Sequence, residues 1–401
     1  MIKNTISSIL SIIFYPIKKI IPKSNIIVLG TFSRQIYRDN TRYLFEYLSE
    51  KQKNKIYWIT DNKYIKSYLK QKNYNYVSTY SPLHMLWILL RAKIIIDSGT
   101  NYFNPFKIMD SNNTIKITTQ HGNGPKSNFS RSGRSKAFTA IQQIQNLLAF
   151  DYVNYPSDYS IEHVGKKAHL LPDEKLINLG YPRCDHFFDK EYVNSRHQKK
   201  MISKSLFNNF KPGSKIIFYT PTWRPYEFKF PLFEMDGFDQ KLFNQWLRKN
   251  DCYFVYSIHT TLEPQDRLDE TDRVCFLDLR KDPFLDVNYF MIEVDILLND
   301  YSTTSTEFAI LNRPQIFFFH DYEKYLKEKG FIEDYKKIMP GNEVKSLSEL
   351  LNTLNEILDN GDNYLDKYNL TQRSLVEKYY NIKNKNSSEN FSNFIDKLLS
   401  Q

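Results

Sequence analysis

Short apolar runs alternate with segments of helical periodicity along this chain, and this alternation limits the possible folds more than any other feature. In the first half, strand-like runs cover residues 25–33, 55–60, 74–79, 93–99 and 114–120. Helix-like segments lie between them, at residues 40–49, 61–71 and 81–90. We expect Ser81 to be the N-cap of the last helix, with Pro82 in its first turn. Strands separated by helices form βαβ units, so the pattern predicts a parallel α/β sheet.

The second half repeats this pattern. Strand-like runs cover residues 215–224, 252–260, 273–278, 294–300 and 314–320, with helices expected at 237–249 and 306–311. Residues 346–401 are mostly helical. We therefore predict two Rossmann-like domains that face each other across a cleft, at residues 25–200 and 201–375, followed by a C-terminal helix at 376–401. Ligands of such sheets bind beyond the carboxyl ends of the strands, where the motifs described below lie.

The composition favours an anionic partner. The 401 residues include 55 Lys and Arg against 45 Asp and Glu, which gives a net charge of +10. A basic chain attracts nucleic acid, acidic lipid, phosphorylated substrates or polyanionic polymers, and charge alone does not choose among them. The three cysteines, Cys184, Cys252 and Cys275, form no CxxC pair. They fit a reducing compartment and argue against a zinc ribbon or a disulfide framework.

The N-terminal residues, MIKNTISSILSIIFYPIKKIIPK, form an apolar run with lysines at both ends. No small-residue cleavage site follows, so a signal peptide is not indicated. The run is too short to cross a bilayer and is broken by Pro16. We expect residues 1–24 to lie as an amphipathic segment on an acidic membrane surface, which places the protein in the cytoplasm, peripheral at the inner face of the cell membrane. The alternative is a first helix that packs on the core.

The stretch DILLNDYSTTSTEFAILNRPQIFF, residues 295–318, is the most informative motif. A strand ends near Asp300, and hydroxyl side chains then open a helix. Free N–H groups at a helix start, with Ser302, Thr303 and Thr304 beside them, suit a phosphate group. Glu307 follows, where a carboxylate accepts hydrogen bonds from a ribose. The alternative is an ordinary N-cap, but five hydroxyl residues from 302 to 306 exceed what a cap needs.

Three other strand ends or turns carry polar side chains. In YTPTWR, residues 219–224, Arg224 suits a diphosphate, and Trp223 either stacks on a base or packs. In SIHTT, His259 ends a strand. The turn GYPRCD contains Arg183 and needs no function as a turn. The alternative for each is an ordinary surface or structural residue.

The stretch TTQHGNGPK, residues 118–126, places His121 after the last strand of the first half. Histidine is the side chain most often used for proton transfer near neutral pH. Gly122 and Gly124 allow the backbone to approach a ligand, and Lys126 is suited to an anion. The chain contains no HExxH, GxGxxG or P-loop motif and no Ser/His/Asp spacing, so hydrolase, metalloprotease and ATPase functions lack support.

These motifs together resemble the CDP-glycerol glycerophosphotransferase family, the teichoic-acid-type primases and polymerases, along residues 25–380. QHGNGPK is similar to the family's Trp-His-Gly-x-x-x-Lys, with Gln120 in place of Trp. GYPRCD, YTPTWR, SIHTT and NDYSTTSTEFAILNRPQIFFFHDYEKY are similar to four further family segments, in the same order. Each motif alone is weak, whereas five in order are specific. The replacement of Trp by Gln120 and the following NGP suggest a changed acceptor side.

The resemblance implies a GT-B-type fold that transfers an alditol phosphate from CDP-glycerol or CDP-ribitol to a hydroxyl of a polymeric or lipid-linked glycan, releasing CMP. The acceptor would be a teichoic-acid or capsule polymer. It implies that His121 is the general base, that Arg183, Arg224, His259, Ser302 and Thr303 hold the diphosphate, and that Glu307 lies near the ribose. The first domain would be the acceptor side and the second would bind the donor.

The full set of expected donor-binding residues is Gly122, Lys126, Arg183, Thr222, Trp223, Arg224, His259, Asp300, Ser302, Thr303, Thr304 and Glu307. Cationic side chains and a helix start can neutralise phosphate oxygens, so we expect neither a metal nor another cofactor. One alternative is a GT-B glycosyltransferase that uses a nucleotide sugar. The other is a basic RNA- or membrane-binding protein, but no RNP, KH or zinc-finger motif is present and we expect no nucleic-acid partner.

Overall fold

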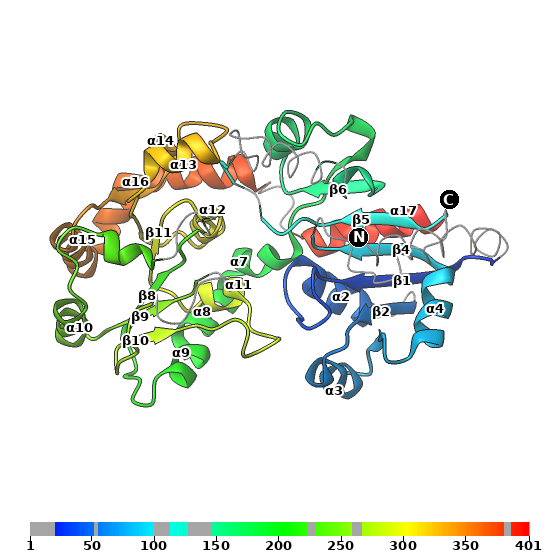
Figure 1. The fold of residues 1–401 in the computed structure, drawn as a ribbon, viewed down its shortest axis with the longest axis horizontal. Coiled ribbons are helices and arrows are strands. Elements are labelled where there is room, and N and C mark those ends of the chain that lie inside the picture. The colour runs from blue at the N-terminus through cyan, green and yellow to red at the C-terminus, as the bar shows by residue number, and fades with distance from the viewer. Residues whose placement is uncertain are drawn as a thin grey trace. The chain divides into compact units, whose positions relative to one another are not determined.

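The structure, a computed structural model, describes residues 21–51, 55–99, 113–122, 124–126, 144, 146–222, 224, 229–258, 267–380 and 386–400. The chain divides into two compact units. The first comprises Met1–Gly122, Gly133–Asp185 and Lys383–Gln401, and the second comprises Asn123–Ser132 and His186–Ile382. Each unit is built on its own parallel sheet (Figure 1).

The first unit contains a seven-stranded sheet in the order β3-β2-β1-β4-β5-β6-β7. Every neighbouring pair is parallel. The strands are β1 (Ser24–Gly30), β2 (Lys55–Ile59), β3 (Asn75–Val77), β4 (Ala92–Asp97), β5 (Ile115–Thr118), β6 (Tyr152–Tyr155) and β7 (Leu176–Asn178). Because β1 and β4 are central, their apolar side chains are buried on both faces of the sheet.

The helices of the first unit connect and cover these strands. They are α2 (Asn40–Lys51), α3 (Lys63–Gln71), α4 (Pro82–Arg91), α6 (Asp158–Ser160), a π-helix (Ile161–Lys166), 3₁₀ turns at Asp173–Lys175 and Pro182–Cys184, and α17 (Ser387–Ser400). The last helix returns from the end of the chain and packs on α2. The Asp185 carboxylate holds its start, accepting hydrogen bonds from the backbone N–H groups of Ser387 and Ser388 at 2.8 and 2.9 Å.

The second unit contains a six-stranded parallel sheet in the order β10-β9-β8-β11-β12-β13. The strands are β8 (Lys215–Tyr219), β9 (Cys252–Tyr256), β10 (Val274–Phe276), β11 (Ile296–Asn299), β12 (Gln315–Phe317) and β13 (Gly341–Glu343). Its core is rich in aromatic side chains, with Tyr219, Phe254 and Tyr256 fully buried. The strands β8 and β9 consist almost entirely of buried apolar residues, as is typical of the central strands of a parallel sheet.

The helices of the second unit complete its layers. They are α7 (Asp185–Phe188), which begins at the unit boundary, α8 (Lys190–Lys199), α9 (Met201–Leu206), α10 (Gln240–Lys249), α11 (Val287–Met291), α12 (Thr304–Phe308), α13 (Tyr322–Glu328), α14 (Tyr335–Ile338), α15 (Leu347–Asp359) and α16 (Gly361–Tyr379), with 3₁₀ turns at Pro231–Glu234 and Ala309–Leu311.

The observed division of the chain differs from the expected boundaries at residues 200 and 375. Helices α8 and α9 belong to the second unit because two buried carboxylates at the start of β11 hold them. Glu293 accepts hydrogen bonds from Arg196 Nη2 at 3.3 Å and from the Ser203 N–H at 2.9 Å. Lys200, between the two helices, pairs with Asp295. At the other end of the chain, α17 belongs to the first unit instead of forming a separate segment.

Two predicted helix starts also differ in detail. Pro82 is the first residue of α4, as expected, but the Ser81 side chain makes no capping hydrogen bond. The helix expected at residues 306–311 begins earlier, at Thr304, and ends in a 3₁₀ turn. The central strands match their predicted ranges more closely than these helix starts do, because a run of apolar residues directly indicates a buried strand.

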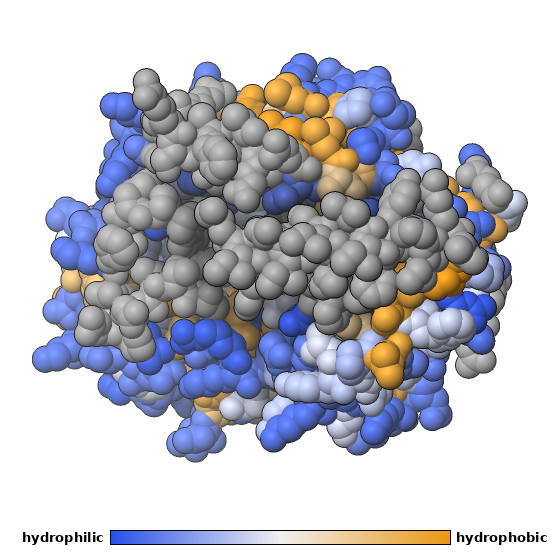
Figure 2. Space-filling view, turned by 45° about the vertical axis from the view of Figure 1, so that its right-hand side comes forward, coloured by the Kyte–Doolittle hydropathy of each residue, from blue (hydrophilic) through white to orange (hydrophobic). Residues whose placement is uncertain are grey.

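On the face shown in Figure 2, most of the described residues in view are hydrophilic, with hydrophobic side chains exposed in a few places. Within the part of the chain that the structure describes, no helix is both long and apolar enough to cross a bilayer. The expected membrane-surface segment, residues 1–24, lies almost entirely outside the described residues.

The carboxylate of Asp295 predicts a specific stability change. Burial opposes its ionisation, but His197, Lys200 and Lys215 outweigh that cost and hold its pKa well below the ordinary value. We expect Asp295→Asn to lower the free energy of unfolding by about 3–5 kcal/mol, because it leaves the buried Lys200 without its partner charge. Urea unfolding followed by circular dichroism measures this change at pH 7.

The control is Asp272→Asn, which removes an exposed carboxylate paired with Arg248 and should change stability by at most about 1 kcal/mol. Because the Asp295 pKa is depressed, its contribution is complete above the unfolded-state pKa and declines as the pH falls toward the folded-state value. Equal effects of the two substitutions would contradict this account.

Candidate functional site

The candidate site lies where the second sheet reverses its strand order. Strands β8 and β11 are neighbours, with β9 and β10 beyond one and β12 and β13 beyond the other. Loops diverge at such a reversal, and ligands of α/β sheets bind there. A cavity of about 380 Å³ opens at these strand ends, a volume typical of small-molecule sites. It is lined by Lys126, Thr220, Pro221, Thr222, Ser257, Ile258, Leu279, Val287, Ser302, Thr304, Tyr325 and Lys329.

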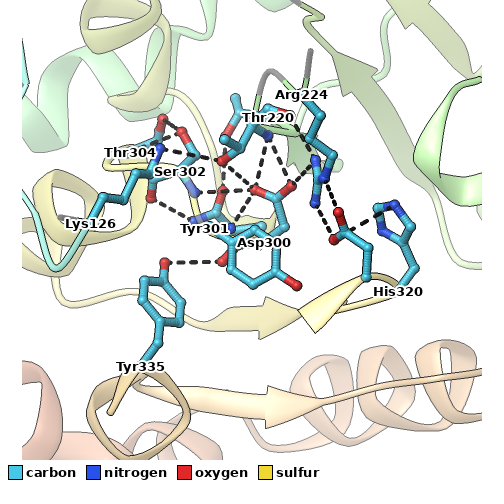
Figure 3. A network of polar contacts seen from close by, with 12 residues as sticks. Lys126, Thr220, Arg224, Asp300, Tyr301, Ser302, Thr304, His320 and Tyr335 are labelled. Carbon is cyan, nitrogen blue, oxygen red and sulfur yellow. Dashed lines mark hydrogen bonds and ion pairs between the residues drawn. The ribbon is translucent and has the colours of Figure 1, made fainter. Parts of the chain in front are cut away.

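Asp300, directly after β11, ties the two central loops together (Figure 3). Its fully buried carboxylate accepts hydrogen bonds from the Thr222 N–H at 2.9 and 3.0 Å and from the Thr222 hydroxyl at 2.8 Å. The N–H groups of Tyr301 and Ser302 donate to the same carboxylate. Asp300 therefore fixes the loops that line the cavity, and both of its carboxylate oxygens accept hydrogen bonds from the protein.

Arg224 is held by two carboxylates. Its Nη1 lies 2.8 Å from Asp300 Oδ2, and its Nε and Nη2 donate to Asp321 at 2.7 and 2.9 Å. The side chain is only 1% exposed and lies over the Tyr301 ring, 5.2 Å from its centre. In this structure the guanidinium is paired with Asp300 and Asp321 beside the cavity, and its expected contact with a diphosphate stays a prediction.

The hydroxyl-rich segment at the start of α12 divides into two sets. Ser302 and Thr304 line the cavity, and their hydroxyls are 2.8 Å apart. Ser305 donates inward to the Gln315 side chain at 2.7 Å, and Thr306 donates to the Thr303 carbonyl at 2.8 Å. Ser305 and Thr306 thus have structural roles, which the number of hydroxyl residues in the sequence could not show.

Thr303 contributes its methyl group to the packing of the 124–126 segment. A Cβ added to Gly124 would lie 2.9 Å from Thr303 Cγ2, so only glycine fits this approach without displacement. The next residue, Pro125, accepts a hydrogen bond from the Ile332 N–H at 2.8 Å, and Lys126 forms a β-bridge with Phe331. These contacts fix the lysine within the second unit.

Lys126 brings positive charge to the cavity. Its Nζ lies 3.5 Å from Thr222 Oγ1 (Figure 3). Removal of the ammonium group from water lowers its pKa to about 8, although Asp300 acts in the opposite direction. The cations Arg224 and Lys329 lower this pKa further. An anion in the cavity would offset that repulsion and desolvation.

Tyr325 and Lys329 are among the cavity-lining residues that were not expected from the sequence. Both lie on or just after α13, where DYEKYLKEKG looks like an ordinary charged helix. The sequence analysis also missed Asp321, whose partner Arg224 is distant in the sequence. Asp321 and Tyr325 lie within the segment NDYSTTSTEFAILNRPQIFFFHDYEKY, but residue type alone does not show which of its side chains reach the cavity or Arg224, because that depends on how β12 and α13 follow β11.

His121 belongs to the first unit, where it follows β5 and is exposed. The preceding Gln120 has a φ of 58°, a left-handed conformation that is unusual for a residue other than glycine. The Gln120 carbonyl accepts a hydrogen bond from Asn40 Nδ2 at 2.9 Å, which holds this turn. The His121 ring lies 6.4 Å from the ring of the exposed Phe32. Gly122 follows His121 and is the last residue of Met1–Gly122, the first of the three chain segments that form this unit.

Arg183 also belongs to the first unit, and it is buried. Its Nη1 donates to Asp39 Oδ1 at 2.5 Å, and its backbone N–H donates to Asn40 Oδ1 at 3.3 Å. Asn40 thus links Arg183 to the turn that carries His121. The Arg183 charge is paired with Asp39 in this structure, and its expected contact with a diphosphate stays a prediction.

Glu307 lies inside the second unit and is 2% exposed. It accepts a hydrogen bond from Asn288 on α11, next to the cavity residue Val287. The expected position of Glu307 near a ribose stays a prediction. Trp223 and His259 lie outside the described residues. Among the residues that are described, no group of three or more His, Cys, Asp and Glu side chains could hold a metal ion.

Comparison with known proteins shows the family of this chain. The family described as CDP-Glycerol:Poly(glycerophosphate) glycerophosphotransferase matches residues 13–397. A teichoic acid glycerol-phosphate transferase of Staphylococcus aureus (strain NCTC 8325 / PS 47) is 30% identical over 391 residues, which cover 91% of this chain and 93% of the relative. A teichoic acid glycerol-phosphate primase of Bacillus subtilis (strain 168) is 26% identical over 334 residues, covering 80% and 78%.

The structure of the wall teichoic acid polymerase TagF superimposes with a TM-score of 0.74 at 21% identity, covering 100% of this chain and 94% of that one. This likeness confirms the predicted GT-B-like fold with its two parallel-sheet units. The match along nearly the whole sequence also confirms the family inferred from the five motifs. The chain belongs to the CDP-glycerol:poly(glycerophosphate) glycerophosphotransferase family and is a transferase.

Proposed function

We propose that this transferase moves glycerol phosphate from CDP-glycerol to a hydroxyl of a teichoic-acid-type polymer, with release of CMP. CDP-ribitol is the alternative donor, and a lipid-linked chain end is the proposed form of the acceptor. Family membership supports the class of reaction. The observation that carries the assignment of the donor site is the cavity at the β8–β11 reversal, which combines Lys126 with the hydroxyls of Ser302 and Thr304.

The proposed donor site holds the diphosphate by charge and by hydrogen bonds. Lys126 supplies a cation, and Ser302 and Thr304 supply hydroxyl donors. Transfer of a phosphoryl-type group depends mainly on positioning and on neutralising charge that develops on oxygen atoms. Thr222 extends the same wall, and its hydroxyl is already oriented by Asp300.

Several residues expected to contact the donor are better proposed as positioning residues. Asp300 and Arg224 fix the two loops that form the cavity floor. Glu307 fixes α11 against α12 through Asn288. Arg183 supports the turn after β5 through Asp39 and Asn40. Gly122 and Thr303 remain proposed parts of the donor site, together with His259 and Trp223.

We assign the general base to His121. A ring nitrogen would take the proton from the acceptor hydroxyl as its oxygen attacks the phosphorus that carries the glycerol. One O–P bond forms, the bond to the bridging oxygen breaks, and CMP leaves with that oxygen. The motif continues into Gly124, where an added Cβ would lie 2.9 Å from Thr303 Cγ2.

We also propose a peripheral position at the inner face of the cytoplasmic membrane. Residues 1–24 combine an apolar run with Lys3, Lys18, Lys19 and Lys23. Such a segment can lie at the headgroup level and be attracted by acidic lipid. A membrane position would bring the enzyme to a lipid-linked acceptor.

The proposed reaction is tested by CMP release from the purified chain with CDP-glycerol, CDP-ribitol and a panel of UDP-sugars, with a membrane-derived acceptor extract. We expect acceptor-dependent CMP release with a CDP-alditol only. His121→Ala should lower turnover by about 10²–10⁴-fold while donor affinity stays unchanged, because it removes a base and no donor contact. His163→Ala is the control for loss of a histidine elsewhere in the first unit. Turnover with a UDP-sugar alone, or a fully active His121→Ala, would contradict the proposal.

Lys126 predicts how donor binding depends on pH. Its pKa of about 8 means that the ammonium is charged below that pH and loses its proton above it. The dissociation constant for CDP-glycerol should therefore rise by up to about tenfold per pH unit above pH 8. Calorimetry between pH 7 and 9.5 measures this slope. Lys126→Arg should bind with little pH dependence over this range, and Lys126→Gln should bind weakly at every pH. A wild-type slope retained in Lys126→Gln would exclude this lysine as its source.

Arg224 distinguishes a positioning role from direct donor contact. Arg224→Gln leaves the buried Asp300 and Asp321 without their shared cation, so we expect a loss of about 3–5 kcal/mol in the free energy of unfolding. Urea unfolding without donor measures this loss. The matched control, Arg248→Gln, removes an exposed arginine and should have little effect. Unchanged stability together with lost donor affinity would restore Arg224 as a diphosphate ligand.

A further inference from the structure

Helix α4 of the first unit is apolar on two opposite sides. Met85, Ile88 and Leu89 are buried against the sheet. On the outer side, Leu83 is 81% exposed and Trp87 is 52% exposed, and their spacing of four residues places them on one face. Tyr80, 76% exposed, lies just before the helix. We call Tyr80, Leu83 and Trp87 the α4 crest. A surface helix normally presents polar residues outward, so this crest requires an explanation.

Two cations, Lys66 and Arg91, lie against the aromatic rings of the crest. Residues 62–93, which run from the start of α3 to the first residues of β4, contain six Lys and Arg residues and no Asp or Glu. Lys66 on α3 lies 4.8 Å from the centre of the Tyr80 ring, and Arg91 lies 4.9 Å from the Trp87 ring. The nearest preceding carboxylate, Asp61, is buried and accepts hydrogen bonds from Ser78 and Thr79. The surface is therefore suited to an anionic partner.

The N-terminal segment joins the fold beside this helix. Lys23 Nζ donates to the carbonyls of Leu90 and Ala92 at 3.1 and 2.8 Å, at the end of α4. Arg91 donates to the Ser24 hydroxyl at 2.6 Å. Lys23 and Ser24, the last residues of the segment proposed above to contact acidic lipid, are thus bound to the last turn of the helix that carries the α4 crest. The C-terminal end of the N-terminal segment and the helix with the α4 crest are therefore neighbours, and both are suited to a lipid surface.

We propose that the α4 crest, with the cations of α3 and α4, docks the first unit on an anionic lipid bilayer. The bilayer interface accommodates aromatic and aliphatic side chains among headgroups and attracts Lys and Arg at the same depth. A soluble polyanion would pair with the cations but would leave Leu83 and Trp87 without apolar contacts. This inference deepens the proposed peripheral position and does not depend on the identity of the donor.

The test is co-sedimentation of the full chain with vesicles made of equal parts phosphatidylglycerol and phosphatidylcholine, and with vesicles of phosphatidylcholine alone. We expect tight binding to the anionic vesicles only. The double variant Leu83→Ser/Trp87→Ser should bind them about tenfold more weakly because it removes apolar surface. Lys63→Gln/Lys66→Gln should weaken binding about tenfold and reduce its dependence on salt.

Matched controls come from the second unit. Leu370→Ser removes a leucine with 82% exposure from α16, and Lys241→Gln/Lys249→Gln removes the same charge from α10. Both should bind vesicles as the wild type does. Circular dichroism verifies that each variant is folded, and CDP-glycerol affinity is measured in parallel. Unchanged donor affinity is expected for all of them, so a failed donor assay would refute the proposed function without affecting this result.

Two outcomes would overturn the docking surface. Wild-type vesicle binding by the folded crest variant, with binding lost only on deletion of residues 2–20, would make the N-terminal segment the sole anchor. Crest and lysine variants that keep vesicle binding but lose binding to soluble poly(glycerol phosphate) would assign this surface to a polymer.

Discussion

The carboxylate of Asp300 is the constraint on which the candidate site depends. It receives hydrogen bonds from the loop after β8 and from the start of the α12 segment, and it pairs with Arg224. Arg224 extends the link to Asp321 after β12. Three adjacent strand ends are therefore held by one buried network of opposite charges. A buried network of this kind is costly when one member is missing, so it stabilises the observed arrangement of the loops around the cavity.

A related arrangement supports the turn before His121. Asn40, at the start of α2, donates to the Gln120 carbonyl and accepts from the Arg183 backbone. Gln120 keeps a left-handed conformation there, and such conformations persist where the surroundings fix them. In both units, arginines that resembled ligand contacts by type are paired with carboxylates of the protein. The account therefore separates a small set of proposed contacts, Lys126, Ser302, Thr304 and His121, from the network that positions them.

The sequence predicted the central strands well because runs such as IIVL in β1 and KIIFY in β8 are apolar throughout. It missed β6, β7 and β13, which are short or polar. Strand β13, Gly341–Glu343, has no apolar side chain, and Gly341 fits against the Gln315 carbonyl where a Cβ would be only 2.0 Å away. The motifs that contain Arg183 and Arg224 could be recognised in the sequence, but their carboxylate partners Asp39, Asp300 and Asp321 could not be predicted from it. A residue type suggests what a side chain can bind, whereas the tertiary fold decides which carboxylate reaches it first.

The most direct test of the central claim is a crystal structure of this chain with CDP-glycerol bound. The account predicts the diphosphate within hydrogen-bonding distance of Lys126 and of the Ser302 or Thr304 hydroxyl, in the cavity at the β8–β11 reversal. It also predicts that Arg224 keeps its contacts with Asp300 and Asp321. A donor bound elsewhere, or an Arg224 side chain that leaves both carboxylates to hold the diphosphate, would contradict it.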